Sequence, residues 1–200
     1  MLRSALDALG YSTTGLSGRV LWNRPVEAPM PPRDHMLLRV DLPEGPHIVD
    51  VGFGVATPTG VLALEPEVEQ ATPHGPYRLL PDGPAFVMEA RLSDQWRPLY
   101  RFDLAEQYFA DYTMVNWYSA HHPDSLFVIG LLIARADTDR RYTLSGTTGG
   151  GVNVAVHHPD GHSERRELNS PTTIRVALEE HFLIDLSGLP DLDAALARLF

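Results

Sequence analysis

Short apolar runs separated by Gly- and Pro-containing turns dominate the hydrophobic pattern of the first half of the chain. The clearest run is residues 86–92, in which Phe86, Met88, Ala90 and Leu92 occupy every second position. A period of two is typical of a strand with one buried face. Other runs predict strands at residues 19–22, 36–40, 48–51, 61–64, 77–80 and 96–102. Many short strands joined by turns indicate a barrel or a strongly curved sheet.

The second half of the chain combines strands with helices. Residues 104–118 are rich in aromatics and are expected to be partly helical, whereas the apolar run 125–134 predicts a long strand buried on both faces. Residues 156–162 have the composition of a hairpin tip. Shorter strands are predicted at residues 142–144, 152–156 and 165–168.

Helices are predicted at the two ends of the chain. Leu2, Ala5, Leu6 and Leu9 repeat at helical spacing, and Gly10 is placed as a C-terminal cap. No residue ahead of Leu2 can act as an N-cap, which indicates either a frayed helix or the tail of a longer one.

Near the C-terminus, Asn169 or Ser170 is expected to cap a helix that has Pro171 in its first turn. The apolar stripe of this helix is Ile174, Ala177, Leu178 and Phe182. A short helix at residues 191–199 closes the chain.

Composition narrows the class of protein. The 200 residues carry a formal net charge of −10, which argues against nucleic acid or an anionic membrane as a partner because both need a basic surface. No apolar run approaches the ~20 residues that a membrane span requires, and no signal peptide is recognisable at the first residues. The expected location is the cytoplasm. The sequence contains no cysteine, so disulfides, zinc thiolates and thiol nucleophiles within this chain are excluded.

His35 and Asp50 are the candidate catalytic residues, on two neighbouring predicted strands. A loop at residues 41–44 would set them opposite each other, whereas a loop at residues 43–46 would shift the register by four and separate them. If they meet, the carboxylate can fix the imidazole tautomer and leave the other ring nitrogen free as a base. A purely structural His–Asp contact is the alternative interpretation.

Gly52 and Phe53 follow Asp50 directly. Phe53 is interpreted either as an aromatic wall for a flat ligand or, in a more ordinary way, as a core residue at a glycine bend. Neither His121-His122 nor His157-His158 forms a good two-ligand metal site, because adjacent residues on a strand point to opposite faces. No metal site is therefore predicted.

Several ordered motifs resemble those of the arylamine N-acetyltransferase family. Residues 32–38 (Pro-Arg-Asp-His-Met-Leu-Leu) are similar to its histidine motif, and residues 50–54 (Asp-Val-Gly-Phe-Gly) with residues 57–59 (Thr-Pro-Thr) are similar to its aspartate motif. Further similarity lies in residues 69–70, 96, 98–102, 111–112, 116–119, 122–127, 165–168 and 180–186. The resemblance covers essentially the whole chain.

This resemblance implies a transferase with a Cys-His-Asp triad, in which a cysteine thiolate takes an acetyl group from acetyl-CoA and passes it to an arylamine or hydrazine. It assigns activation of the thiol to His35, orientation of the imidazole to Asp50, and the lining of the acceptor pocket to Gly52 and Phe53. Acetyl-CoA is the acyl-donor substrate and coenzyme A the released product. No metal is implied.

The implied fold is α+β, with an antiparallel β-barrel followed by an α/β lid. The family's N-terminal helical bundle, of a cysteine-protease-like fold, is expected to be missing here. Residues 1–15 would be a remnant of that bundle, residues 16–120 the barrel with the catalytic His and Asp, and residues 121–200 the lid.

Two departures from the family pattern stand out. The family's cysteine lies in an arginine- and glycine-rich motif just ahead of the helix that resembles residues 2–10, and neither that motif nor a cysteine is present in this sequence. The residue before the histidine is usually a small hydroxyl residue, whereas here it is Asp34. A carboxylate at this position would favour a charged imidazole or change the pocket, unless it points away.

These observations leave three functional hypotheses. The first is an N-acetyltransferase whose recorded start lies downstream of the true one, so that the 200-residue chain alone is inactive. The second is a shortened, non-catalytic relative that acts as a binding module. The third is an amide synthase of the related macrolactam-forming type, which uses the same triad on a polyketide chain.

Overall fold

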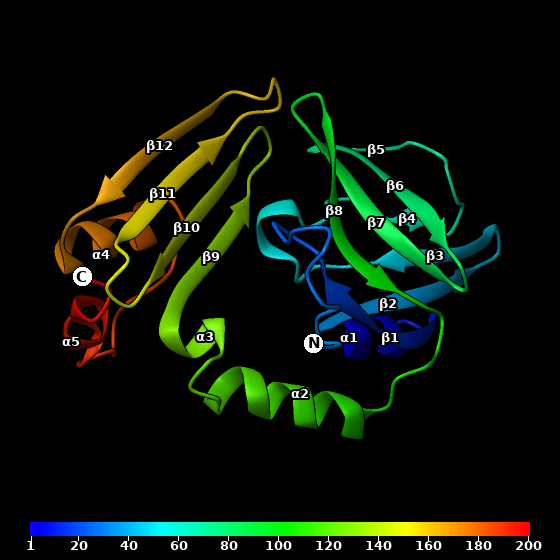
Figure 1. Cartoon of the computed structure of the whole chain (residues 1–200), viewed down its shortest axis with the longest axis horizontal. Coiled ribbons are helices and arrows are strands. Elements are labelled where there is room, and N and C mark those ends of the chain that lie inside the picture. The colour runs from blue at the N-terminus through cyan, green and yellow to red at the C-terminus, as the bar shows by residue number, and fades with distance from the viewer. The chain divides into compact units, whose positions relative to one another are not determined.

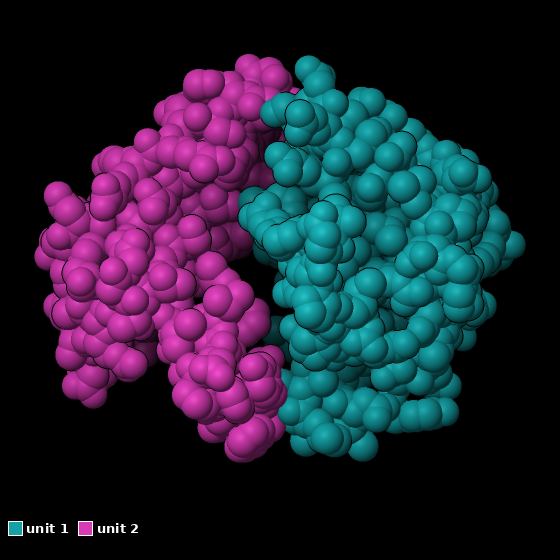
Figure 2. Space-filling view, in the orientation of Figure 1, with its two compact units in different colours: residues 1–115 teal, residues 116–200 magenta.

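The computed structural model describes all of residues 1–200, which divide into two compact units (Figures 1 and 2). Unit 1 comprises residues 1–115 and unit 2 comprises residues 116–200. Helix α2 (Phe109–His121) runs from the end of the first unit into the second. No helix has the length and apolar character needed to cross a membrane.

Unit 1 is built around one antiparallel sheet of eight strands in the order β4-β3-β2-β1-β8-β7-β6-β5. The strands on one side of the sheet are β1 (Ser12–Val20), β2 (His35–Leu42), β3 (Gly45–Val49) and β4 (Leu62–Ala63). Those on the other side are β5 (Gln70–Thr72), β6 (Gly75–Asp82), β7 (Ala85–Leu92) and β8 (Gln95–Phe102). The predicted curved antiparallel sheet is therefore confirmed.

The side chain of Gln70 joins the two edge strands of this sheet. Its Oε1 accepts a hydrogen bond from the Ala63 N–H at 2.7 Å, and its Nε2 donates to the Ala63 carbonyl at 2.9 Å. One amide side chain thus replaces a backbone pairing between β5 and β4, which stand at opposite ends of the strand order. This bridge makes the sheet a near-barrel and satisfies backbone groups that an open edge leaves unpaired.

The interior of the near-barrel is a cluster of fully buried apolar side chains. It comprises Leu16, Leu37, Ile48, Ala56, Leu62, Tyr77, Leu79, Met88, Ala90, Leu99, Tyr100 and Phe102. Helix α1 (Leu2–Ala8) packs against β1 in the same unit. Gly10 follows the helix with φ of +87°, as the predicted C-terminal cap requires.

Unit 2 holds a four-stranded antiparallel sheet in the order β12-β11-β10-β9. Its strands are β9 (Gly130–Ala136), β10 (Arg141–Thr147), β11 (Val152–His157) and β12 (Ser163–Leu168). Helices α4 (Pro171–Glu180) and α5 (Leu192–Ala197) share a core with this sheet (Figure 1). Of the two predicted caps, Asn169 and Ser170, it is Ser170 that caps α4, by accepting a hydrogen bond from the Thr173 N–H. Pro171 lies in the first turn, as predicted.

Two predicted elements need correction, and one strand has no counterpart in the prediction. The run 125–134 is not one long strand: a short helix α3 (Leu126–Ile129), capped by the Ser125 hydroxyl, precedes β9. Strand β9 lies at an edge of its sheet and is not buried on both faces, since its burial alternates. Strand β1 begins at Ser12 although its first half is polar and glycine-rich, and β5 was missed because it has only three residues.

Candidate functional site

Asp50 directly follows β3 and carries a carboxylate that is fully buried. Its Oδ1 accepts a hydrogen bond from the Gly52 N–H at 2.8 Å, and its Oδ2 lies 2.7 Å from His35 Nε2. Burying a carboxylate is costly unless hydrogen bonds compensate for lost hydration. The local turn supplies one of these bonds and the neighbouring strand supplies the other.

The register of the β2–β3 hairpin differs from both alternatives considered above. Leu42 pairs with Gly45 and Leu38 with Val49, so the turn consists of Pro43 and Glu44. Extending this register places Asp50 opposite Leu37, and His35 becomes its diagonal neighbour on the same face of the sheet. The hydrogen bond forms across this diagonal, which a long imidazole side chain can span.

The hydrogen bond to Asp50 determines which nitrogen of His35 is available. Because Nε2 faces the carboxylate, the neutral imidazole carries its proton on Nε2. The other ring nitrogen, Nδ1, makes no hydrogen bond in the structure. An imidazole oriented by a buried carboxylate, with one nitrogen free, has the arrangement of a general base.

Aromatic rings enclose the imidazole. The ring centroid of Tyr100 lies 4.7 Å from that of His35, and the Phe53 ring lies edge-on at 5.2 Å. Trp22 contacts Phe53 edge-on at 6.4 Å. These rings restrict the imidazole to one orientation and exclude water from its flanks. Phe53 is half-buried against the core of unit 1, so it belongs both to that core and to the surroundings of His35.

A bulge in β8 directs Tyr100 into the interior. Glu89 pairs with Pro98 and Met88 with Tyr100, so Leu99 is the extra residue on β8. Proline cannot donate a ladder hydrogen bond, and a bulge next to it breaks the alternation of the strand. As a result, Leu99 and Tyr100 are both fully buried although they are adjacent.

Tyr100 also approaches Asp50. Its hydroxyl is buried and has no hydrogen-bond partner within the chain. Burial, together with the negative charge of Asp50, raises the pKa of Tyr100 well above its ordinary value, so this side chain remains a neutral phenol. Glycine at position 18 leaves room for the Tyr100 ring, because a Cβ there would lie only 3.3 Å from it.

The two glycines after Asp50 have different roles. Gly54 adopts a φ of +77°, a conformation that favours glycine, and it begins a short 3-10 helix, η1 (Gly54–Ala56). Gly52 has no positive φ, and a Cβ there would meet only Asp50 Oδ1 at 3.8 Å. Its contribution to the site is the backbone N–H that Asp50 accepts.

Asp34 lies directly before His35. Burial raises the pKa of the Asp34 carboxyl, while the charges of His35, Arg24 and Arg19 act in the opposite direction. Both arginines are already bonded to backbone carbonyls of the proline-rich loop: Arg19 donates to Pro31 at 2.5 Å and Arg24 donates to Pro29 at 2.7 Å. These hydrogen bonds hold the loop that precedes His35, and the bond from Arg19 attaches it to the end of β1.

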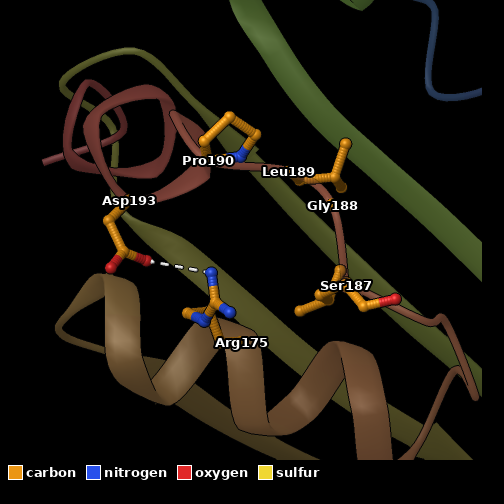
Figure 3. A pocket seen from close by; sticks show the side chains of 7 residues that line it. Arg175, Ser187, Gly188, Leu189, Pro190 and Asp193 are labelled. Carbon is orange, nitrogen blue, oxygen red and sulfur yellow. Dashed lines mark hydrogen bonds and ion pairs between the residues drawn. The ribbon is translucent and has the colours of Figure 1, made fainter.

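An open cavity of about 560 Å³ lies in unit 2 and contains none of the predicted site residues (Figure 3). Its lining is formed by Arg175 of α4 and by residues 186–190 and 193. The charged side chains facing it, Arg175 and Asp193, pair with each other at 3.3 Å, as the dashed line in Figure 3 marks. This self-paired, open surface has no feature that points to chemistry.

Sequence reasoning named His35, Asp50, Gly52 and Phe53, and the structure brings all four together. It assigned no role to Trp22, Gly18 or Tyr100, although Tyr100 lies within residues 98–102, which resemble the family. The proline at position 98 is the signal in the sequence that could have indicated the bulge and hence the inward turn of Tyr100.

Comparison with known proteins identifies close relatives over nearly the whole chain. A family model described as N-acetyltransferase matches residues 1–190. An arylamine N-acetyltransferase from Mycolicibacterium smegmatis is 37% identical over 195 residues, which are 96% of this chain and 69% of that protein. One from Escherichia coli K12 is 38% identical over 182 residues, which are 88% of this chain and 61% of that protein.

Solved structures agree with these sequence matches. The M. smegmatis arylamine N-acetyltransferase superposes with a TM-score of 0.91 at 37% identity, over 99% of this chain and 72% of that chain. The Mycobacterium marinum enzyme in complex with CoA superposes with a TM-score of 0.92 at 34% identity, over 99% of this chain and 73% of that chain. This chain therefore spans 61% to 73% of the length of these relatives.

Proposed function

Because this chain belongs to the arylamine N-acetyltransferase family, we propose that His35 and Asp50 serve the transfer of an acetyl group from acetyl-CoA to an arylamine or hydrazine. The observation that carries this proposal is the 2.7 Å contact of His35 Nε2 with a fully buried carboxylate while Nδ1 is left free. Acetyl-CoA as the donor is supported by the M. marinum relative, whose structure is a complex with CoA.

In this proposal His35 acts on a cysteine thiol through Nδ1. The imidazole accepts the thiol proton, and the buried carboxylate of Asp50 stabilises the imidazolium that forms. The thiolate attacks the acetyl carbonyl of acetyl-CoA, a new thioester forms on the cysteine, and CoA leaves as its thiolate, which takes a proton. The amine then attacks that thioester, loses a proton, and releases the cysteine thiolate.

Phe53 and Trp22 would form the wall against which a flat acceptor ring lies. Phe53 lies edge-on to both Trp22 and the imidazole, and a flat acceptor ring can pack favourably against such aromatic side chains. The backbone at Gly52 would complete this lining. The acceptor amine would thus be held near the atom that receives the proton.

The 200 residues contain no cysteine, so we propose that this polypeptide by itself does not catalyse acetyl transfer. This absence favours a second role for the isolated chain as a non-catalytic module that binds CoA or an arylamine. Acetylation of an arylamine by the purified 200-residue chain would refute that second role.

The test of the main proposal supplies the missing thiol. In the cysteine-bearing fusion, the N-terminal segment of the M. smegmatis relative that carries the family's cysteine motif precedes residue 1. We expect the fusion to release CoA from acetyl-CoA in the presence of an arylamine. Its cysteine-to-alanine variant and its H35Q variant should not do so, and a folded fusion that lacks transfer, or an H35Q variant that retains it, contradicts the proposal.

A further inference from the structure

His35 lies at a weakly supported end of its strand. The pairing of β2 with β3 stops at Leu38 and Val49, so the backbone of His35 pairs on one side only, with Gly18 of β1. The preceding residues 21–34 form no strand. Backbone hydrogen bonds therefore hold the His35 backbone less firmly than they hold residues in the middle of the sheet.

An ion pair flanks this strand end. The Arg33 guanidinium donates two hydrogen bonds to the Asp103 carboxylate, from Nη1 to Oδ1 at 3.1 Å and from Nη2 to Oδ2 at 2.5 Å. Asp103 Oδ1 also accepts the Ala105 N–H at 3.2 Å. A bidentate pair fixes the relative orientation of both groups and not only their distance.

The side chains of this pair are only partly exposed, with 34% of Arg33 and 22% of Asp103 accessible. The hydrogen bonds from Arg33 lower the pKa of Asp103, so the carboxylate stays charged near neutral pH. The pair is thus intact under the conditions in which the imidazole would work.

The pair connects the ends of the strands that carry His35 and Tyr100. Arg33 is two residues ahead of His35, and Asp103 directly follows Phe102 at the end of β8. Strand β1 separates β2 from β8 in the sheet, and Gly18 of β1 pairs with both His35 and Phe102. The ion pair therefore ties together two strands that share no backbone hydrogen bonds.

The stacking of His35 on Tyr100 depends on that connection. Tyr100 lies on β8, and its ring centroid is 4.7 Å from that of His35 on β2. A shift of the first residues of β2 relative to β8 would open this contact and lengthen the bond from Nε2 to Asp50. The bidentate contact resists such a shift at the end of β2 that has no pairing with β3.

We propose that Arg33 and Asp103 are positioning residues, which hold the His35 imidazole between Asp50 and Tyr100 with Nε2 toward the carboxylate. This inference rests on the proposed function only in taking His35 as the base. What it states is the orientation of the His35 ring, which can be measured in the 200-residue chain without acetyl transfer.

The test is long-range ¹H–¹⁵N NMR of the histidine rings, with His35 assigned through an H35Q variant. In the unmodified chain, we expect His35 to be protonated on Nε2, with a proton that exchanges slowly with water. In D103N and in R33Q, we expect this exchange to be about tenfold faster or more, because local opening of the strand end becomes cheaper. In R33K, which keeps the charge but not the bidentate contact, the effect should be intermediate.

The matched control is E89Q. The Glu89 side chain pairs with Arg78 between β7 and β6 of the same sheet, and these side chains are 13% and 29% exposed. E89Q changes only this side chain and keeps the backbone pairing of residue 89 with Pro98 beside the bulge. E89Q should lower the melting temperature about as much as D103N but leave the His35 ring signals unchanged.

Unchanged His35 exchange in D103N and R33Q overturns the positioning role, and so does an equal change in E89Q, which would show general loosening. Should D103N fail to fold, R33K decides the question by the same signals. A His35 ring that lacks the Nε2 contact in the unmodified chain counts instead against the proposed function, so the two failures are distinguishable.

Discussion

His35 in unit 1 and His157 in unit 2 are both hydrogen-bonded, partly buried imidazoles on strands, but their partners differ. His35 has a buried carboxylate at Nε2 and nothing at Nδ1. The ring of His157 has the Thr143 hydroxyl at Nε2, 3.0 Å away, and the Ser163 hydroxyl at Nδ1, 2.9 Å away. The second arrangement occupies both nitrogens, so it suits a structural cross-link between strands. A candidate base needs an oriented ring and also a free nitrogen.

The charges around the two rings also differ: a carboxylate contacts His35, whereas positive charges surround His157. Burial lowers the pKa of His157, and the nearby positive charges of Arg165, Arg141 and His158 lower it further. No carboxylate hydrogen-bonds to this ring to stabilise an imidazolium. The comparison shows why a histidine doublet in the sequence carries little information about chemistry, whereas a histidine with a buried aspartate on the adjacent strand carries much more.

The largest expected difference between the two rings is in acetyl transfer by the cysteine-bearing fusion. D50N should reduce kcat/KM by about 10³–10⁴-fold, because the amide can no longer stabilise the imidazolium or fix the tautomer. H157N should change it by less than about twofold, since it alters a hydrogen-bonded site without free nitrogens. Equal losses of kcat/KM in D50N and H157N would contradict the distinction between a catalytic His35 and a structural His157.

The second difference concerns stability, because the ring beside His35 belongs to a core. Y100A removes a fully buried aromatic side chain and should lower the unfolding free energy of unit 1 by about 3–5 kcal/mol. Y142A, beside His181 and Phe182 in unit 2, removes a half-buried ring and should cost about 1–3 kcal/mol. Native-state hydrogen exchange measures both units separately.

Y100F is the matched control for this prediction. It removes only a hydroxyl that has no partner within the chain, so it should be neutral or slightly stabilising. A strong loss of stability in Y100F would show that the hydroxyl is bonded in solution.

The third difference lies in how the sheets end. Q70L leaves the Ala63 N–H and carbonyl without their partner and should destabilise unit 1 by about 1–3 kcal/mol. E164Q on the exposed edge strand of unit 2 should change stability by less than about 0.5 kcal/mol. Exchange protection of the Ala63 amide reports the bridge directly, and unchanged protection in Q70L contradicts it.

The smallest expected effect is a pH dependence of unit 2. The pKa of His157 is lower in the folded chain than in the unfolded chain. As the pH falls, the imidazole is therefore protonated in the unfolded chain at a higher pH than in the folded chain, and stability falls below about pH 6.5. H157N should flatten this dependence, as measured by melting between pH values of about 7.5 and 5.5.

Unit 1 should respond to acid at lower pH. The lowered pKa of Asp103 means that the stability from its ion pair is present above about pH 4 and is lost as the pH falls through the lowered folded value. Unit 2 is therefore expected to loosen before unit 1 in an acid titration. The reverse order would contradict the assignment of these shifts.

Local signals in the sequence predicted many elements of the fold. The alternation of residues 86–92 identified β7, and Ser170 with Pro171 identified the start of α4. Where the local signal misled, tertiary context prevailed: the apolar run 125–134 is divided between a helix and an edge strand. The polar, glycine-rich start of β1 pairs because its neighbour β2 supplies a complementary backbone edge.

The sequence by itself determined the local chemistry: which residues turn or cap, and which histidine and aspartate belong to a recognisable motif. Tertiary structure alone decided that Pro43 and Glu44 form the turn, that Nε2 rather than Nδ1 faces Asp50, and that Gln70 bridges two sheet edges. It also decided that Arg33 meets Asp103, 70 residues away. Turn and cap preferences depend on a few adjacent residues, whereas register and distant contacts depend on the packing free energy of the whole sheet, to which every strand contributes.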